Sequence, residues 1–387
     1  MKVTLRNFIL IPLSFFLFIG MEHQANSQDL ILKPDSLLMD VNYLEELMTS
    51  VHPGVYRYNS EEEVQQLFHS LRNRIKNRTL TEKEWMISLA QAVNNVKCGH
   101  TYLNPWNMKR SIRERLFGGA IYFPLGFQLI DEQLVVTENL SDEPSIRRGD
   151  VIKSINQIPS EQLLDSLKTI AKVDGDNRSP ISDYLSLDEF GVTRWEAFDL
   201  YFHLFFGVDE TFQVQVAHGT ETKNYTFPAL TKKDRMDRYK GKPLGRWDLT
   251  FDDTKAIMKL GTFATWNWKD FDHKAWFAES FQSIKDKNIE TLIVDIRGNG
   301  GGLAEPRDEL VKYLIKKELP CKNDNKVLIR TTKIDPSLIP FIDTWNKAIL
   351  EGVPAAYYTK FEKDWYALKE SLDCTTLYPK DLAFDGA

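Results

Sequence analysis

The sequence has few cysteines and lacks the common motifs that bind a metal ion. Its three cysteines, Cys98, Cys321 and Cys374, are too far apart for a disulfide framework or a paired CxxC zinc site. None of its seven histidines lies in an HExxH motif or four residues from another histidine. We therefore expect no metal and no cofactor, and either one disulfide bridge or three free thiols.

An excess of positive charge is also missing, as are long apolar runs. The formal net charge is −6, and the acidic residues are spread along the chain. A protein that binds nucleic acid through its phosphates needs an excess of Lys and Arg, so we expect no nucleic-acid partner. Beyond the N-terminal segment, no apolar run approaches the roughly 20 residues that span a bilayer. We expect no stable membrane span in the mature chain.

The first residues are typical of an export signal. Lys2 and Arg6 precede an apolar stretch at residues 8–19, and residues 25–27 (ANS) give a small-x-small cleavage pattern. The apolar stretch is too short to span a bilayer. We predict a signal peptide at residues 1–27 and a periplasmic or extracellular mature protein; the alternative is an uncleaved anchor.

The rest of the chain divides into three regions, which together predict a multi-domain α/β protein. Residues 36–110 carry apolar residues at helical spacing, with a capping-box signal at Thr81, and predict a helical N-terminal domain. Residues 120–230 alternate around short turns and predict a β-rich domain. The polar residues 231–247 are predicted to be a linker, and residues 247–387 a layered α/β domain.

A glycine-rich loop follows the most apolar run of the third region. Residues 291–296 (TLIVDI) are typical of a strand buried on both faces, and residues 297–302 (RGNGGG) follow. Glycines after a strand leave backbone N–H groups free to meet an anion. A phosphate loop fits poorly, because GxGxxG order and Gly-Lys-Ser/Thr are missing. Two predictions for the loop are therefore favoured: an oxyanion hole and a plain strand-to-helix turn.

His100, in the segment 98–103 (CGHTYL), is a candidate general base. Histidine is the usual base near neutral pH, although a single histidine in a sequence is more often structural. Cys98 lies two residues away, and close neighbours in sequence rarely reach the geometry of a Cys–His pair. We interpret Cys98 as a small buried residue.

A third pattern indicates a peptide-binding surface. Residues 124–127 (PLGF) begin a predicted strand, and residues 148–156 (RGDVIKSIN) follow it. A glycine-bearing loop ahead of a strand can offer N–H groups to a peptide carboxylate while the strand edge pairs with the peptide. The alternative is an ordinary small β-rich domain, but the combination favours peptide binding.

Taken in order, the helical region, GHTYL, PLGF with GDVIKSIN, and LIVDIRGNGGG resemble the tail-specific (C-terminal processing) serine peptidases over most of residues 36–317. The resemblance implies that residues 120–230 form a PDZ-like domain. It also implies that residues 247–387 form a protease core of the crotonase-like or ClpP-like type. The implied activity is cleavage of peptides or unfolded proteins by a serine nucleophile, without a cofactor.

The resemblance also implies site residues. Gly300 or Gly301 supplies an oxyanion N–H group. His100 falls where the tricorn-like branch of the family has its catalytic histidine, whereas another branch uses lysine as the base. Three residues fall on the PDZ loop that binds a peptide carboxylate: Leu125, Gly126 and Phe127.

The chain departs from the family pattern at the nucleophile. In the family, a serine follows the glycine loop on a later strand-to-helix turn with a Thr-x-Ser-Ala-like signature. After Gly302 this chain has only Ser337 and Ser371, and neither follows an apolar strand. We expect an incomplete protease core, through truncation, frameshift or fragmentation, and no measurable cleavage by this chain alone. The alternative function is a non-catalytic PDZ-like protein that captures peptide C-termini.

Overall fold

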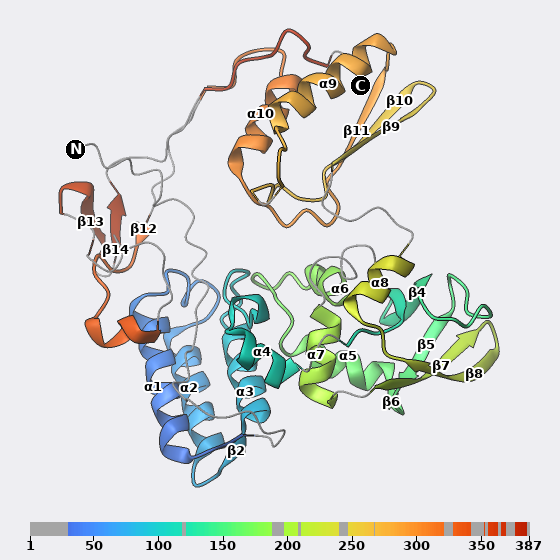
Figure 1. Ribbon diagram of the computed structural model, residues 1–387. Helices are drawn as coiled ribbons and strands as arrows, with labels where there is room; N and C mark the ends of the chain where they lie inside the picture. Colours follow the sequence, from blue (N-terminus) through green and yellow to red (C-terminus); the bar gives the residue numbers. More distant parts are fainter. Residues whose placement is uncertain are drawn as a thin grey trace. The chain divides into compact units, whose positions relative to one another are not determined.

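The described residues form two compact units (Figure 1). Unit 1 comprises the chain up to residue 241 together with residues 327–370, and unit 2 comprises residues 242–326 and those from 371 onward. The structure, a computed structural model, describes residues 30–117, 121–187, 197–207, 210–239, 247–266, 268–320, 328–341, 352, 355–362, 365–368 and 376–384. The predicted signal peptide, Cys321, Cys374 and Ser371 lie outside these residues.

Three helices at the start of unit 1 confirm the helical pattern of the sequence. They are α1 (Pro34–Ser50), α2 (Glu61–Ile75) and α3 (Glu82–Asn94), with a two-stranded ladder of β1 (Ile31–Leu32) and β2 (Leu80–Thr81) beside them. The capping box predicted at Thr81 is present, because Thr81 and Glu84 each accept the other's backbone N–H. Ser60 and Glu63 form a second one at the start of α2. Two short helices follow: η2 (Pro105–Asn107) and α4 (Arg110–Phe117).

The β-rich region forms one antiparallel sheet of six strands. The strands are β3 (Leu125–Ile130), β4 (Gln133–Asn139), β5 (Val151–Ile155), β6 (Ile158–Pro159), β7 (Thr211–His218) and β8 (Glu221–Pro228). Their order is β3-β4-β5-β7-β8, with β6 beside β5, so β3 lies at an edge. Asp131 and Glu132 take positive φ angles of 46° and 62° in the tight β3–β4 turn. Helices α5 (Ser160–Lys168), α6 (Ser179–Leu185) and α7 (Ala197–Phe206) accompany the sheet.

The helical and β-rich regions share an apolar core. Met86 and Ala90 of α3 pack in the same buried cluster as Phe127 of the sheet and Phe198 of α7. The chain segment after residue 327 also packs on unit 1, where Leu338 joins a buried cluster with α1. This segment contains β12 (Leu328–Ile329), η4 (Pro336–Phe341), η5 (Ala355–Tyr357), β13 (Tyr358–Glu362) and β14 (Trp365–Leu368).

The predicted linker at 231–247 is wrong for residues 232–238, which form helix α8 (Lys232–Arg238). Thr231 caps this helix by accepting the N–H of Asp234. Arg235 is 1% exposed and donates to the carboxylate of Asp199, which also accepts the N–H of Phe123. The polar composition that suggested a linker therefore includes an arginine whose ion pair fastens α8 to α7.

Unit 2 is a three-stranded sheet covered by two helices. The strands are β9 (Asp248–Asp252), β10 (Lys255–Lys259) and β11 (Thr291–Asp295), and the helices are α9 (His273–Asp286) and α10 (Ala304–Leu314). The order is β11-β10-β9; β11 runs parallel to β10, and β9 runs antiparallel to it. Phe277 and Phe281 of α9 and Tyr313 of α10 pack with Ala256 and Met258 of β10.

The expectation that residues 291–296 are buried on both faces is wrong in this structure. Within the described part of the chain, β11 is an edge strand, and none of its five residues is buried. Leu292 and Val294 pack against the core, whereas Ile293 is 45% exposed on the opposite face. Ile257 pairs with Ile293 in the ladder and is 39% exposed on the same face of the sheet.

No helix among the described residues is long and apolar enough to cross a bilayer.

The buried ion pair between α7 and α8 gives a stability prediction. Replacing Asp199→Ala leaves the Arg235 guanidinium buried without its partner and the N–H of Phe123 without its acceptor. We expect the free energy of unfolding to fall by about 3–5 kcal/mol in urea titrations. Asp237→Ala is the control, because its partner Lys233 is exposed and such pairs contribute about 0–1 kcal/mol. Equal losses in the two variants would contradict the prediction.

Candidate functional site

The glycine loop after β11 is held against the segment that follows β10. The N–H of Phe263 donates to the carbonyl of Gly301, and the N–H of Leu303 donates to the carbonyl of Phe263, both at 2.9 Å. Asn299 donates from Nδ2 to the carbonyl of Leu260 at 2.8 Å. These bonds fix the loop at the end of the parallel pair β10–β11.

Gly302 makes this contact possible. Its φ is 142°, and a Cβ at this position would lie 2.0 Å from the carbonyl carbon of Phe263. No side chain fits in that space, because real Cβ contacts do not fall below about 3 Å. Glycine is therefore required at 302 for a steric reason that is independent of any chemistry.

The sequence left open whether Gly300 or Gly301 has the oxyanion role, and the structure distinguishes the two. The N–H of Gly301 donates to Oδ1 of Asn299 at 2.9 Å, so it is already used inside the loop. The N–H of Gly300 has no acceptor within the described residues, and the residue is exposed with no heavy atom within 4 Å of an added Cβ. Gly300 is thus the member of the pair that can meet an outside acceptor.

An ion pair shapes the entry to the loop. Arg297 donates to both carboxylate oxygens of Asp295, at 2.9 and 2.7 Å, and its backbone N–H donates to the same group. Hydrogen bonding from Arg297 holds the pKa of Asp295 down, at about 2. The carboxylate therefore stays charged near neutral pH. It stabilises the turn and does not act as a proton donor or acceptor.

Trp247 supports the opposite side of the loop contact. Its indole Nε1 donates to the carbonyl of Thr262 at 2.8 Å, and the ring packs edge-to-face against Phe263 and Phe271. The Thr262 hydroxyl in turn accepts the N–H of Ala264. A buried aromatic cluster thus fixes the turn on which the glycine loop rests.

His100 lies in unit 1, in a tight turn that follows α3. The N–H of Thr101 donates to the carbonyl of Cys98 at 2.9 Å, and the His100 side chain is exposed. Burial raises the pKa of the Cys98 thiol, but the neighbouring His100, His52 and Thr101 lower it to about 5. The interpretation of Cys98 as a small buried residue is wrong, because the residue is only half-buried.

His52 is a member of this site that the sequence did not reveal. It is 2% exposed, and its Nε2 lies 2.8 Å from Oγ1 of Thr101. The N–H of Gly54 donates to its Nδ1 at 3.0 Å, so the neutral ring carries its proton on Nε2. The only sequence signal was its place in the His-Pro-Gly loop after α1, which gives no hint of a partner 49 residues away.

Leu125, Gly126 and Phe127 begin the edge strand β3. Leu125 and Phe127 are fully buried, and the N–H of Phe127 donates to the carbonyl of Leu187 at 3.0 Å. A Cβ on Gly126 would lie 2.9 Å from the same carbonyl. These residues stay predicted peptide ligands, but the edge they occupy already has a partner from the chain itself.

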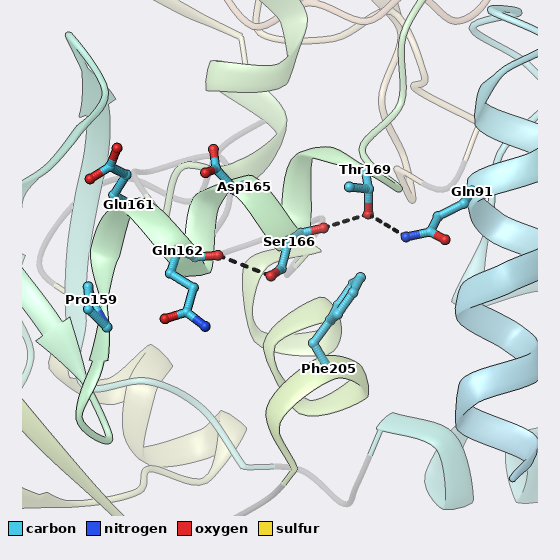
Figure 2. Close-up of a pocket in the computed structure, with 8 residues that line it drawn as sticks. All are labelled: Gln91, Pro159, Glu161, Gln162, Asp165, Ser166, Thr169 and Phe205. Atoms are coloured by element: carbon cyan, nitrogen blue, oxygen red, sulfur yellow. Dashed lines mark hydrogen bonds between the residues drawn. The ribbon is translucent and has the colours of Figure 1, made fainter.

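Two shallow pockets in unit 1 contain none of the predicted site residues. The first, of about 530 Å³, lies between α3 and α5. Figure 2 shows Thr169 there, linking the carbonyl of Ser166 to the amide of Gln91. The second, of about 490 Å³, lies between α2 and α3. Among the described residues, no group of three or more His, Cys, Asp or Glu is arranged to hold a metal ion.

The chain is similar to one protein family and to several solved structures. The model of peptidase family S41 matches residues 256–337, which include most of β10, all of β11 and the whole glycine loop. No curated protein matches the chain. Among solved structures, a CPAF mutant is similar with a TM-score of 0.52 and 13% identity, over 78% of this chain and 62% of that one. Mature CPAF, also at 13% identity, gives a TM-score of 0.49 over 79% of this chain and 62% of that one.

The matched segment supports a peptidase, and the likeness to the CPAF mutant shows a shared fold of mixed helices and sheets. The match of residues 256–337 agrees with the peptidase family that the motifs predicted. The chain spans 62% of the length of the CPAF structures.

The close approach at Gly302 gives a second prediction. Gly302→Ala puts a methyl group into the backbone of Phe263, and we expect the free energy of unfolding to fall by more than about 2 kcal/mol. Gly300→Ala is the matched control: it has open space, and we expect a change within about 0.5 kcal/mol. Urea unfolding, with hydrogen exchange of the amides of Phe263 and Leu303, measures both. Unchanged exchange in Gly302→Ala would show that the contact does not hold the loop.

Proposed function

We propose that this chain carries the oxyanion donor and the general base of an exported serine-type peptidase of the tail-specific class. The observation that carries the proposal is the unused N–H of Gly300, in a braced glycine loop inside the segment that matches the S41 family. Such an amide can stabilise the negative oxygen of a tetrahedral intermediate, and removing one such donor typically costs about 10²–10³ in rate.

His100 is the proposed base. The residue is exposed, so it can reach a substrate or nucleophile. The only described serine after the loop, Ser337, donates its hydroxyl to Asp335 at 2.6 Å and shows no histidine partner. We therefore assign no nucleophile among the described residues. The substrates are proposed to be peptides or unfolded proteins, and the predicted export signal favours a periplasmic or extracellular site.

A phosphinate peptide tests the oxyanion donor directly. Its tetrahedral anion mimics the intermediate and needs no nucleophile, so the chain can be used as it is. We expect the ¹⁵N-glycine amide signal of Gly300 to shift on titration, whereas that of Gly301, bonded to Asn299, shifts much less. Gly300→Ala assigns the signal, because one glycine resonance disappears.

The control is the same peptide with an ordinary amide in place of the phosphinate. We expect it to bind at least about 10²-fold more weakly, because it lacks the developed charge. Equal binding of the two peptides, or no movement of the Gly300 signal, would overturn the proposed oxyanion role. Casein turnover by this chain that a serine-directed inhibitor blocks would contradict only the absence of a nucleophile.

The second candidate function is capture of peptide C-termini by the PDZ-like region. It is favoured by the position of β3 at the edge of its sheet, where a peptide can add as a further strand. It requires displacement of the chain's own segment, because the N–H of Leu129 donates to Oγ of Ser186 at 3.0 Å and the N–H of Phe127 donates to Leu187.

Weakening that internal contact should therefore strengthen capture. Ser186→Ala removes the acceptor of Leu129, and we expect about 2–10-fold tighter binding of a peptide with a free carboxylate, the value of one hydrogen bond. Ser166→Ala, on the solvent side of α5, is the control and leaves the affinity unchanged. Calorimetry with the free and amidated forms of one peptide gives the result. Equal affinity for both forms would exclude C-terminal capture.

A further inference from the structure

Arg297 lies at the corner of the turn that leads from β11 into the glycine loop. The N–H of Asn299 donates to the carbonyl of Ile296 at 3.0 Å, which closes a four-residue turn with Arg297 and Gly298 in its central positions. Gly298 has a φ of 72°, the positive value that glycine supplies at the second central position of a type II turn. The Arg297 side chain is 91% exposed, so it faces solvent directly beside the loop.

Asp295 holds the guanidinium of Arg297 in one orientation. The two oxygens of this carboxylate accept from Nε and Nη2 of Arg297, and the Asp295 side chain itself is only 10% exposed. An arginine side chain has five N–H donors in a rigid plane. Two of them are used on Asp295, so three remain, on Nη1 and Nη2, and they have no acceptor in the described part of the chain. The free edge of the guanidinium is therefore fixed before any ligand arrives.

The charge around this free edge is positive. Lys259 lies opposite Asp295 in the register of β10 and β11, so two cations and one carboxylate give a local charge of +1. Hydrogen bonding from Arg297 and the charge of Lys259 both lower the pKa of Asp295, to about 2. A further carboxylate is attracted to the free edge, because the positive charge of the group exceeds that of the one acid it contains.

The free edge also lies close to the proposed oxyanion donor. Arg297 is three positions before Gly300, so their Cα atoms are at most about 11 Å apart. A peptide in extended conformation advances about 3.3 Å per residue. A peptide whose carbonyl oxygen meets the Gly300 N–H therefore has its neighbouring residues, up to about three positions away, within range of Arg297.

We propose that Arg297 is a specificity-determining residue whose free edge binds a carboxylate of the substrate, within about three residues of the carbonyl that Gly300 receives. The planar fork of a guanidinium matches a carboxylate, which accepts two parallel N–H bonds. The carboxylate belongs either to an Asp or Glu side chain or to a substrate C-terminus, two sources of the same chemistry. The inference rests on the proposed oxyanion role of Gly300, because it needs a substrate placed at that amide.

Phosphinate peptides test the proposal with the chain as it is. The parent peptide carries Gln at the three positions on each side of the phosphinate and has an amidated C-terminus. Derivatives replace one Gln at a time by Glu, and one further derivative ends in a free carboxylate three residues after the phosphinate. We expect at least one derivative to bind about 3–10-fold more tightly than the parent in calorimetry, as for one exposed charge-assisted pair. The derivative that gains affinity distinguishes a side-chain carboxylate from a C-terminal one.

Variants of the chain assign this gain to Arg297. Arg297→Gln should bring the derivative and the parent to equal affinity, because the amide has neither the charge nor the fork. Arg297→Lys keeps the charge without the fork and should retain only part of the gain. Lys285→Gln is the matched control: it removes an exposed positive charge in the last turn of α9, before β11 begins, and leaves the gain unchanged.

The comparison among peptides uses the wild-type chain, so it holds even if Arg297→Gln weakens folding. Equal binding of the parent and every derivative would overturn the proposal, and so would a gain that survives in Arg297→Gln.

The Gly300 amide signal separates these results from the oxyanion role. If the parent peptide shifts that signal while all derivatives bind equally, the proposed function stands and only the role of Arg297 is rejected. If the signal does not move, the oxyanion role fails and the role of Arg297 fails with it.

Discussion

The candidate site in unit 2 depends on one steric constraint, the approach of the Gly302 backbone to that of Phe263. At this distance a side chain is impossible, so the loop can lie against the neighbouring segment only where it carries glycine. The two backbone bonds on either side of Gly302 then fix the path of the loop, and the Asn299 side chain uses the N–H of Gly301. What remains is a rigid loop with the Gly300 amide open to solvent. Preorganisation of this kind, and not glycine content itself, is what an oxyanion hole requires.

Much of the secondary structure could be predicted from the sequence, because helix caps and tight turns depend on residues that are close together in the chain. The capping box at Thr81 and the β3–β4 turn each depend on residues within a few positions of one another. The failures needed information from elsewhere in the fold. Residues 232–238 resembled a linker because the sequence does not show that Asp199 is a buried partner of Arg235. Nothing near Thr101 in sequence indicates that the buried His52 lies beside it. The apolar run at 291–296 predicted a strand correctly, but its burial depends on which elements cover the sheet.

The two candidate functions can be ranked by asking which backbone amides are already occupied. Strand addition to β3 needs the N–H groups of Phe127 and Leu129, and both donate to Leu187 and Ser186, which are buried. A peptide must first break these bonds. The binding free energy that it gains is therefore only the difference between two similar sets of hydrogen bonds. The oxyanion role needs the N–H of Gly300, which has no acceptor among the described residues and must give up only water. The fixed Gly300 amide, which has no acceptor among the described residues, therefore favours the oxyanion role in unit 2. Peptide capture by β3 instead requires that the bonds to Ser186 and Leu187 break first.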